Sequence, residues 1–141
     1  MPEFPSLRVY LDSNVLFSAS YDQNSVFLNF WRMRNVGVVA SYYAAGEVSR
    51  NIDVDSHRQR FEALLARTEL VSDTDADFLP SHVKLPMKDA PILAAAIFAG
   101  VDYLATGDKR HFSHLYGTAV LGVRIIRPSD FLELHKDRLP E

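Results

Sequence analysis

The feature that most constrains this fold is the order in which strand-like and helix-like segments follow one another. Five short runs have the apolar, β-branched character of buried strands, at 8–11, 36–40, 69–71, 101–105 and 120–126. Segments with helical spacing of apolar residues separate them, at 15–20, 25–34, 42–50, 55–68, 90–99, 109–112 and from 129 onward. Alternation of this kind is typical of parallel strands joined by crossover helices. We therefore expect an α/β fold, a three-layer α/β/α sandwich with a mostly parallel sheet of about five strands.

Capping residues indicate where several of these helices begin and end. Ser41 and Ser129 are the expected N-caps of the helices that follow them. The helix at 90–99 has Pro91 in its first turn and Gly100 directly after its end. The acidic, Pro-containing stretch 72–88 is expected to be a loop and not a domain boundary. Because the chain has 141 residues, we expect residues 1–141 to form a single domain with its own core.

Composition excludes several classes of protein. The chain has no cysteine, which excludes a disulfide scaffold, a cysteine nucleophile and a thiolate zinc site. No stretch approaches the ~20 apolar residues of a membrane span. Residues 1–5 lack the basic and apolar regions of a signal peptide. We therefore expect a cytoplasmic protein without a membrane partner. The net charge of −3 argues mildly against indiscriminate nucleic-acid binding, unless bound metal cancels part of it.

Three aspartates occupy positions where a parallel sheet binds ligands. Asp12 follows the first strand directly, and Asp108 follows the fourth across a Thr-Gly turn. Ligands of such sheets bind outside the carboxyl ends of the strands. Asp89 begins the helix that leads into the fourth strand. Any one of the three, taken alone, is explained by N-capping of a helix.

The combination of these acids predicts a metal site. Two carboxylates ~5 Å apart repel each other by about 3 kcal/mol at an effective dielectric constant of ~20. A cluster of them must therefore bind cations or hold protons. With oxygen ligands and no cysteine, the expected cofactor is Mg²⁺ or Mn²⁺ and not zinc.

The segments around these acids resemble the sequence motifs of the PIN-domain nucleases. The matching segments are VYLDSNVL at 9–16, AGEV at 45–48, KDAPILAAA at 88–96, LATGD at 104–108 and IRPSDFL at 126–132. They run in the family's order over almost the whole chain. The second of them places Glu47 at the family's second acid. The resemblance implies divalent-metal-dependent cleavage of RNA at a site of three or four acids. It also extends to the toxin ribonucleases of bacterial (VapC-type) toxin–antitoxin pairs, which implies an antitoxin as a protein partner.

The resulting hypothesis assigns a role to each of these residues. Asp12, Asp89 and Asp108 bind one or two metal ions, and Glu47 completes the catalytic set. Ser13, Asn14 and Thr106 are expected to orient carboxylates or water, with turn and cap chemistry as the alternative. Lys109 and Arg110 are expected to contact the RNA backbone, with a solvated surface pair as the alternative. His111 and His114 have the i, i+3 spacing of a metal pair, but they are not expected to bind metal, because nothing else near them suggests a ligand set.

An aromatic-rich set of residues is larger than a core of this size needs. The set consists of Val26, Phe27, Phe30, Trp31, Tyr42 and Tyr43. Most of these side chains are expected in the core. The remainder are expected to form a face for an antitoxin or for a homodimer.

Other functions are compatible with parts of this pattern. An RNA-processing nuclease outside any toxin system would have the same motifs, and so would a non-catalytic module that binds RNA or protein. A phosphorylatable receiver domain would need adjacent acids after the first strand, but Asp12 is followed by Ser13. A dinucleotide-binding enzyme would need a Gly-rich loop at that place, and the sequence has none there.

Overall fold

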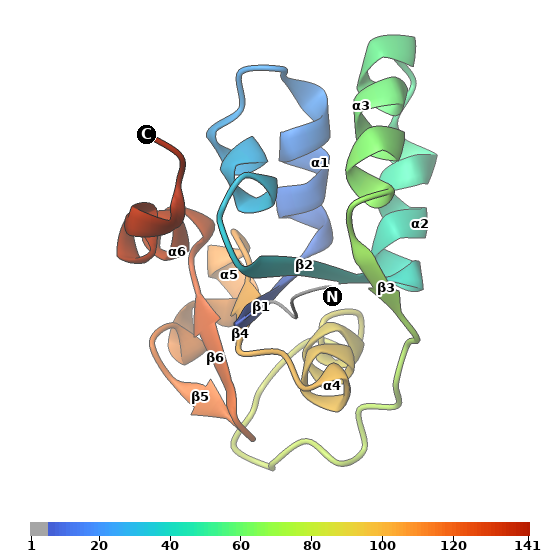
Figure 1. Ribbon diagram of the computed structural model, residues 1–141. Helices are drawn as coiled ribbons and strands as arrows, with labels where there is room; N and C mark the ends of the chain where they lie inside the picture. The colour runs from blue at the N-terminus through green and yellow to red at the C-terminus, as the bar shows by residue number, and fades with distance from the viewer. Residues whose placement is uncertain (1–5) are drawn as a thin grey trace.

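The structure is a computed structural model that describes residues 6–141. Residues 1–5, on which the prediction about a signal peptide depends, lie outside this range. Six strands form one sheet in the order β3-β2-β1-β4-β6-β5 (Figure 1). Their bounds are β1 Leu7–Leu11, β2 Val36–Ser41, β3 Glu69–Val71, β4 Tyr103–Ala105, β5 Ala119–Val120 and β6 Val123–Ile126. All neighbouring strands are parallel except β5 and β6.

Alternate residues along the strands point to opposite faces of the sheet and belong to two separate hydrophobic cores. Val9 and Leu11 of β1 belong to the core on one face, and Tyr10 between them belongs to the core on the other. The first core packs against α1 (Ser13–Tyr21), the 3₁₀ helix η1 (Val26–Trp31), α2 (Tyr42–Asn51), α3 (Asp55–Leu65) and α6 (Pro128–Leu134). The second packs against α4 (Ala90–Ala99), α5 (Lys109–Phe112) and η2 (Ser113–Leu115). A short 3₁₀ helix, η3 (Lys136–Arg138), follows α6. The predicted three-layer α/β/α arrangement is therefore confirmed (Figure 1).

The direction of chain progression reverses between β1 and β4. The sheet grows from β1 through β2 to β3, and the chain then returns to place β4 on the free side of β1. Leu11 at the end of β1 is in register with Ala105 at the end of β4. Such a reversal opens a crevice at the carboxyl ends of the two central strands, where ligands bind in open α/β sheets. Asp12 lies at this crevice, and its backbone N–H donates to the Ala105 carbonyl at 3.1 Å.

The prediction of one strand over 120–126 was wrong. The segment is a hairpin, in which β5 pairs antiparallel with β6 and Val120 lies opposite Val123. The two residues of the turn, Leu121 and Gly122, have φ angles of 48° and 92°. A two-residue hairpin turn of this type requires positive φ at both positions. Glycine meets that requirement without strain, but leucine gave no signal of a turn.

Three helix boundaries also differ from the predictions. The segment 25–34 contains only the 3₁₀ helix Val26–Trp31, and the helix expected to reach residue 68 ends at Leu65. Ser129 is not the N-cap of the last helix, because that helix begins at Pro128, with Arg127 in the cap position. Proline suits the first helical position, since the N–H that it lacks has no helical partner there.

Other local predictions are confirmed. The Ser41 hydroxyl accepts from the Ala44 backbone N–H at 3.0 Å and so caps α2. Gly100 ends α4 in the left-handed conformation at φ 71°. The stretch 72–88 contains neither a strand nor an α-helix. Within residues 6–141, no helix has both the length and the apolar character that crossing a bilayer requires.

Candidate functional site

The four predicted acids meet in one small cavity. Its volume is about 170 Å³, and its wall includes Asp12, Glu47, Asp89 and Asp108. The acids come from four places in the chain: the end of β1, the middle of α2, and the N-cap positions of α4 and α5. The rest of the wall consists of Ser13, Asn14, Tyr43, Lys88 and Ile92. The fold therefore brings together side chains that are separated by as many as 96 positions in the sequence.

Asp12 is the most buried of the four acids, with 2% of its surface exposed. Its Oδ1 accepts from the Ser13 backbone N–H at 2.7 Å, and its Oδ2 accepts from the Thr106 hydroxyl at 2.8 Å. Burial raises the pKa of Asp12, and the charges of Asp89 and Asp108 raise it further, against these two hydrogen bonds. Asp12 is thus a rigidly held carboxylate whose negative charge the surroundings disfavour.

Thr106 and Asn14 connect Asp12 to the loop that precedes Asp108. The fully buried Thr106 hydroxyl, which donates to Asp12, accepts from the Asp108 backbone N–H at 3.1 Å. The Asn14 side-chain amide donates to Asp12 Oδ2 at 3.3 Å, and its carbonyl accepts from the Gly107 N–H at 3.0 Å. A Cβ at position 107 would lie 3.3 Å from that carbonyl oxygen, so this close approach favours glycine. Ser13, Asn14 and Thr106 therefore all contact Asp12, as their predicted orienting role requires.

Asp89 stands in a cap position but does not cap its helix. Its side chain accepts no backbone N–H of α4, which rules out capping as the explanation for this acid. Only 5% of Asp89 is exposed, and its Oδ2 has no hydrogen-bond partner among the described residues. Burial raises the pKa of Asp89. The charges of Asp108 and Glu47 raise this pKa further, whereas His111 and Lys88 lower it. A buried carboxylate oxygen without a partner is costly unless a cation or a proton meets it.

Asp108 caps its helix and also lines the cavity. Its Oδ1 accepts from the His111 backbone N–H at 3.2 Å and caps α5. Its Oδ2 lies 2.7 Å from His111 Nδ1 and lines the cavity. Capping fixes the carboxylate at the edge of the sheet, next to Asp12 and Asp89.

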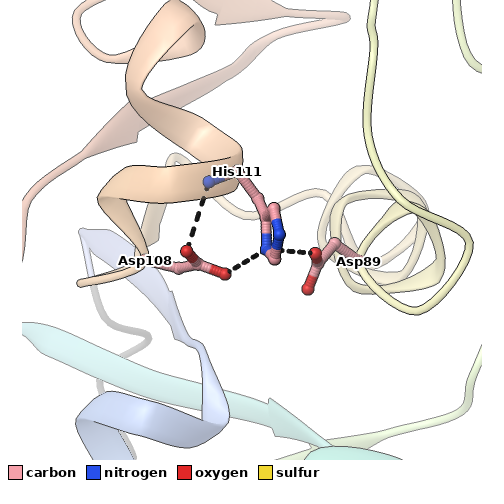
Figure 2. Close-up of side chains that lie close together, drawn as sticks. All are labelled: Asp89, Asp108 and His111. Atoms are coloured by element: carbon pink, nitrogen blue, oxygen red, sulfur yellow. Dashed lines mark hydrogen bonds and ion pairs between the residues drawn. The ribbon is translucent and has the colours of Figure 1, made fainter.

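His111 belongs to this cluster, which sequence reasoning missed. Its ring nitrogen Nδ1 lies 2.7 Å from Asp108 Oδ2 and 2.9 Å from Asp89 Oδ2 (Figure 2). One ligand atom from each of Asp89, Asp108 and His111 lies within 4.8 Å of the others. The spacing of Asp108 and His111 at i and i+3 was the available signal, because it places both on one side of a helical turn. His114 is exposed and does not join the cluster.

Two larger cavities adjoin the acid cluster. One, of about 550 Å³, shares Asn14 and Asp108 with it and is lined further by Lys109, Tyr116 and Arg127. The other, of about 510 Å³, shares Ser13, Asn14 and Glu47 with it and lies between α1 and α2. Of the two predicted RNA-binding residues, Lys109 lines a cavity, whereas Arg110 is exposed and lines none of these three.

The aromatic-rich set divides between core and surface. Phe30 and Trp31 are buried in the core and Phe27 packs against it partly buried, so half of the set lies there and not most of it, as was predicted. Val26 is 58% exposed, Tyr42 59% and Tyr43 46%. Tyr43 also lines the acid cavity. The exposed part of the set therefore lies partly beside the site, at the beginning of α2.

Comparison with known proteins shows the fold. No protein-family model and no curated protein matches the chain. Among solved structures, it is similar to a chain of the crystal structure of VapBC2 from Rickettsia felis bound to a DNA fragment from their promoter. The TM-score is 0.61 and the sequence identity 14%, and the match covers 86% of this chain and 98% of that chain. The chain thus has the three-layer α/β fold of that protein, and the four acids lie at the sheet edge where this class of fold binds its ligands.

Proposed function

We propose that this protein is a divalent-metal-dependent endoribonuclease of the PIN type and the toxin of a toxin–antitoxin pair. The observation that carries the proposal is the convergence of Asp12, Glu47, Asp89 and Asp108 on one cavity. Mutual repulsion among these carboxylates disfavours such an arrangement unless a cation is bound. The motif resemblance and the fold shared with a VapBC2 chain both support this interpretation.

The donor atoms of the cavity fit Mg²⁺ or Mn²⁺. Asp12, Asp89 and Asp108 would hold the metal, and Asp89 Oδ2, which is buried and accepts no hydrogen bond within residues 6–141, is the atom that most needs a cation. A divalent ion bound there supplies Lewis-acid stabilisation of the phosphodiester and a nucleophilic water at neutral pH. Thr106 and the Ser13 N–H hold Asp12 in one orientation, so little reorganisation of this ligand accompanies binding.

The remaining residues support hydrolysis without a nucleophilic side chain. Glu47 enters the cavity from α2 and is the acid that we assign to accept the proton of the attacking water. The water oxygen bonds to phosphorus as its proton passes to Glu47, the bond from phosphorus to the 3′ oxygen breaks, and that oxygen takes up a proton from solvent. The expected products are a 5′ phosphate and a 3′ hydroxyl.

The cavity of about 550 Å³ beside the acids is the proposed path for the RNA backbone. Lys109 and Arg127 line it, and the Arg127 guanidinium lies 5.1 Å from the centre of the Tyr116 ring. That distance suits a cation–π contact. Arg127 makes no ion pair within residues 6–141, so its five donors remain available for phosphate. Lys109→Ala should weaken binding of an RNA oligonucleotide and lower its salt dependence, and Arg110→Ala should do so less, because Arg110 lines none of the three cavities.

An antitoxin is the proposed protein partner. The cavity between α1 and α2 includes the apolar side chains of Phe17 and Val48, and the exposed Tyr42 and Tyr43 begin α2. A partner helix that covers this face would also cover Glu47 and block the site. A homodimer through the same face is the rival expectation. Light scattering on the isolated protein separates the two, because a stable dimer through this face would leave no room for the antitoxin.

The direct test is cleavage of RNA by purified Asp12→Asn protein with magnesium. We expect cleavage to fall to background, while Asp53→Asn, an exposed acid that does not line the site, keeps full activity. End analysis of the products should show 5′ phosphates. Undiminished cleavage by the Asp12→Asn protein would remove Asp12 from the mechanism. Stabilisation by metal without cleavage of any of several RNAs would favour a non-catalytic binding module.

A further inference from the structure

The ring of His111 stands between two carboxylates that it cannot satisfy at the same time. Nδ1 lies 2.7 Å from Asp108 Oδ2 and 2.9 Å from Asp89 Oδ2 (Figure 2). A single ring nitrogen carries at most one hydrogen, and only the Asp108 oxygen lies in hydrogen-bonding geometry with it. The hydrogen bond is made with Asp108, and Asp89 Oδ2 is left buried without a partner. A metal ion between these groups would be coordinated by all three atoms.

Two of the three separations in this group resemble those of neighbouring metal ligands. Adjacent ligands of an octahedral ion with bonds of about 2.1 Å are separated by about 3.0 Å. The two contacts of His111 Nδ1, at 2.7 and 2.9 Å, are close to that separation. The other ring nitrogen, Nε2, makes no hydrogen bond within residues 6–141, and the side chain is 22% exposed. Nε2 can therefore carry the ring proton toward water when Nδ1 acts as a ligand.

We propose that His111 is a nitrogen ligand of the metal centre and that it makes the centre select Mn²⁺ over Mg²⁺. This inference rests on the metal site in the proposed function and adds to it a ligand from outside the acidic set. Mg²⁺ prefers oxygen ligands, whereas imidazole is a good ligand for transition metals. A site of carboxylates with one imidazole therefore favours Mn²⁺ more than a site of carboxylates alone.

Pulsed electron paramagnetic resonance of the Mn²⁺-loaded protein tests this directly. We expect modulation from a coordinated ¹⁴N nucleus in the unsubstituted protein. Labelling with ¹⁵N-histidine should replace it by the ¹⁵N pattern. The signal should vanish in His111→Ala and remain in His114→Ala, the matched control, because His114 lies on the surface away from the acids. The isotope comparison needs no substitution and shows whether a histidine nitrogen coordinates the ion, and within residues 6–141 His111 is the histidine grouped with the acids.

Metal affinity gives a second measurement that requires neither RNA nor cleavage. By calorimetry, His111→Ala should weaken Mn²⁺ binding about tenfold or more, and Mg²⁺ binding by only a few fold. Mn²⁺ binding without nitrogen modulation would overturn the assignment of His111 and leave the nuclease proposal intact. Absence of Mn²⁺ binding to the unsubstituted protein would overturn both this ligand assignment and the metal centre. Equal losses for the two ions would contradict the selectivity.

Discussion

Replacing Asp89 by asparagine should make the metal-free protein more stable. The Asp89 and Asp108 oxygens of the cluster lie within 4.8 Å of each other. Two unit charges at about that separation repel by about 3 kcal/mol at an effective dielectric constant of ~20. Asp89→Asn removes the cost of burying a charge and this repulsion, which together outweigh the attraction to His111 that is also lost, and it keeps the size of the side chain. Solvent near the half-buried Asp108 screens part of the effect, so we expect a gain of about 1–3 kcal/mol.

The assay is urea unfolding at pH 8 in the presence of a chelator, with thermal unfolding as a second readout. A gain of this size corresponds to a rise in Tm of roughly 3–10 °C for a chain of this length. Addition of Mg²⁺ or Mn²⁺ at about 100 times its Kd should stabilise the unsubstituted protein by about 2.7 kcal/mol and leave Asp89→Asn almost unchanged. Asp53→Asn, which changes an exposed acid that does not line the cavity, should respond to metal like the unsubstituted protein.

Two results would refute this reasoning. If Asp89→Asn loses stability in chelator, the Asp89 carboxylate makes a favourable interaction that outweighs its repulsion by Asp108. If metal stabilises Asp89→Asn as much as the unsubstituted protein, the ion binds elsewhere. In either case the repulsion among the acids of this cavity would not be the reason for it to bind a cation.

Three further predictions concern single residues in and beyond the cavity. Because burial raises the pKa of Asp12 above its ordinary value of 3.8, the folded protein keeps a proton that the unfolded chain releases as the pH rises. The contribution of Asp12 to the free energy of unfolding in chelator should therefore decrease from about pH 4 towards neutrality. In urea titrations over this pH range, the free energy of unfolding of Asp12→Asn should decrease less than that of the unsubstituted protein. Thr106→Val removes a buried hydroxyl that donates to Asp12 and accepts from the Asp108 N–H, and it should cost about 1–3 kcal/mol in urea unfolding and weaken Mn²⁺ binding about tenfold or more in calorimetry. An unchanged affinity would show that Thr106 does not orient Asp12 for metal. Leu121→Asn should raise the free energy of unfolding by about 0.5–1 kcal/mol, because Leu121 is 58% exposed and has a φ of 48° that asparagine tolerates better. A loss of stability in urea unfolding would mean that the leucine side chain makes a contact that outweighs the backbone strain.

Much of the fold can be predicted from the sequence because it depends on local patterns. The alternation of strand-like and helix-like runs predicts parallel strands with helices on both faces, and Ser41 and Gly100 mark helix ends by capping chemistry that acts within a few residues. The places of Asp12 and Asp108 after their strands follow from the same patterns. Where a local signal is weak or conflicting, prediction fails. Leu121 lies in a turn although leucine is not a typical turn residue. The last helix begins one residue before the serine that was expected to cap it.

Only the tertiary structure decided which of these acids meet. No local pattern states that β4 pairs with β1 and not with β3, because strand order depends on how distant helices pack on the sheet. That pairing places Asp12 beside Thr106 and Asp108. The packing of α4 brings Asp89 into the cavity, and the packing of α2 adds Glu47. His111 contacts Asp108 through local i, i+3 spacing, and the tertiary structure adds its contact with Asp89.

The sequence by itself therefore determined the layers of this protein and the kinds of charged group at the ends of its strands. The tertiary structure determined that these groups face a single cavity. The physical reason is range: helix capping and side-chain periodicity act over a few residues. The contacts that gather the acids join parts of the chain as far apart as positions 12 and 106.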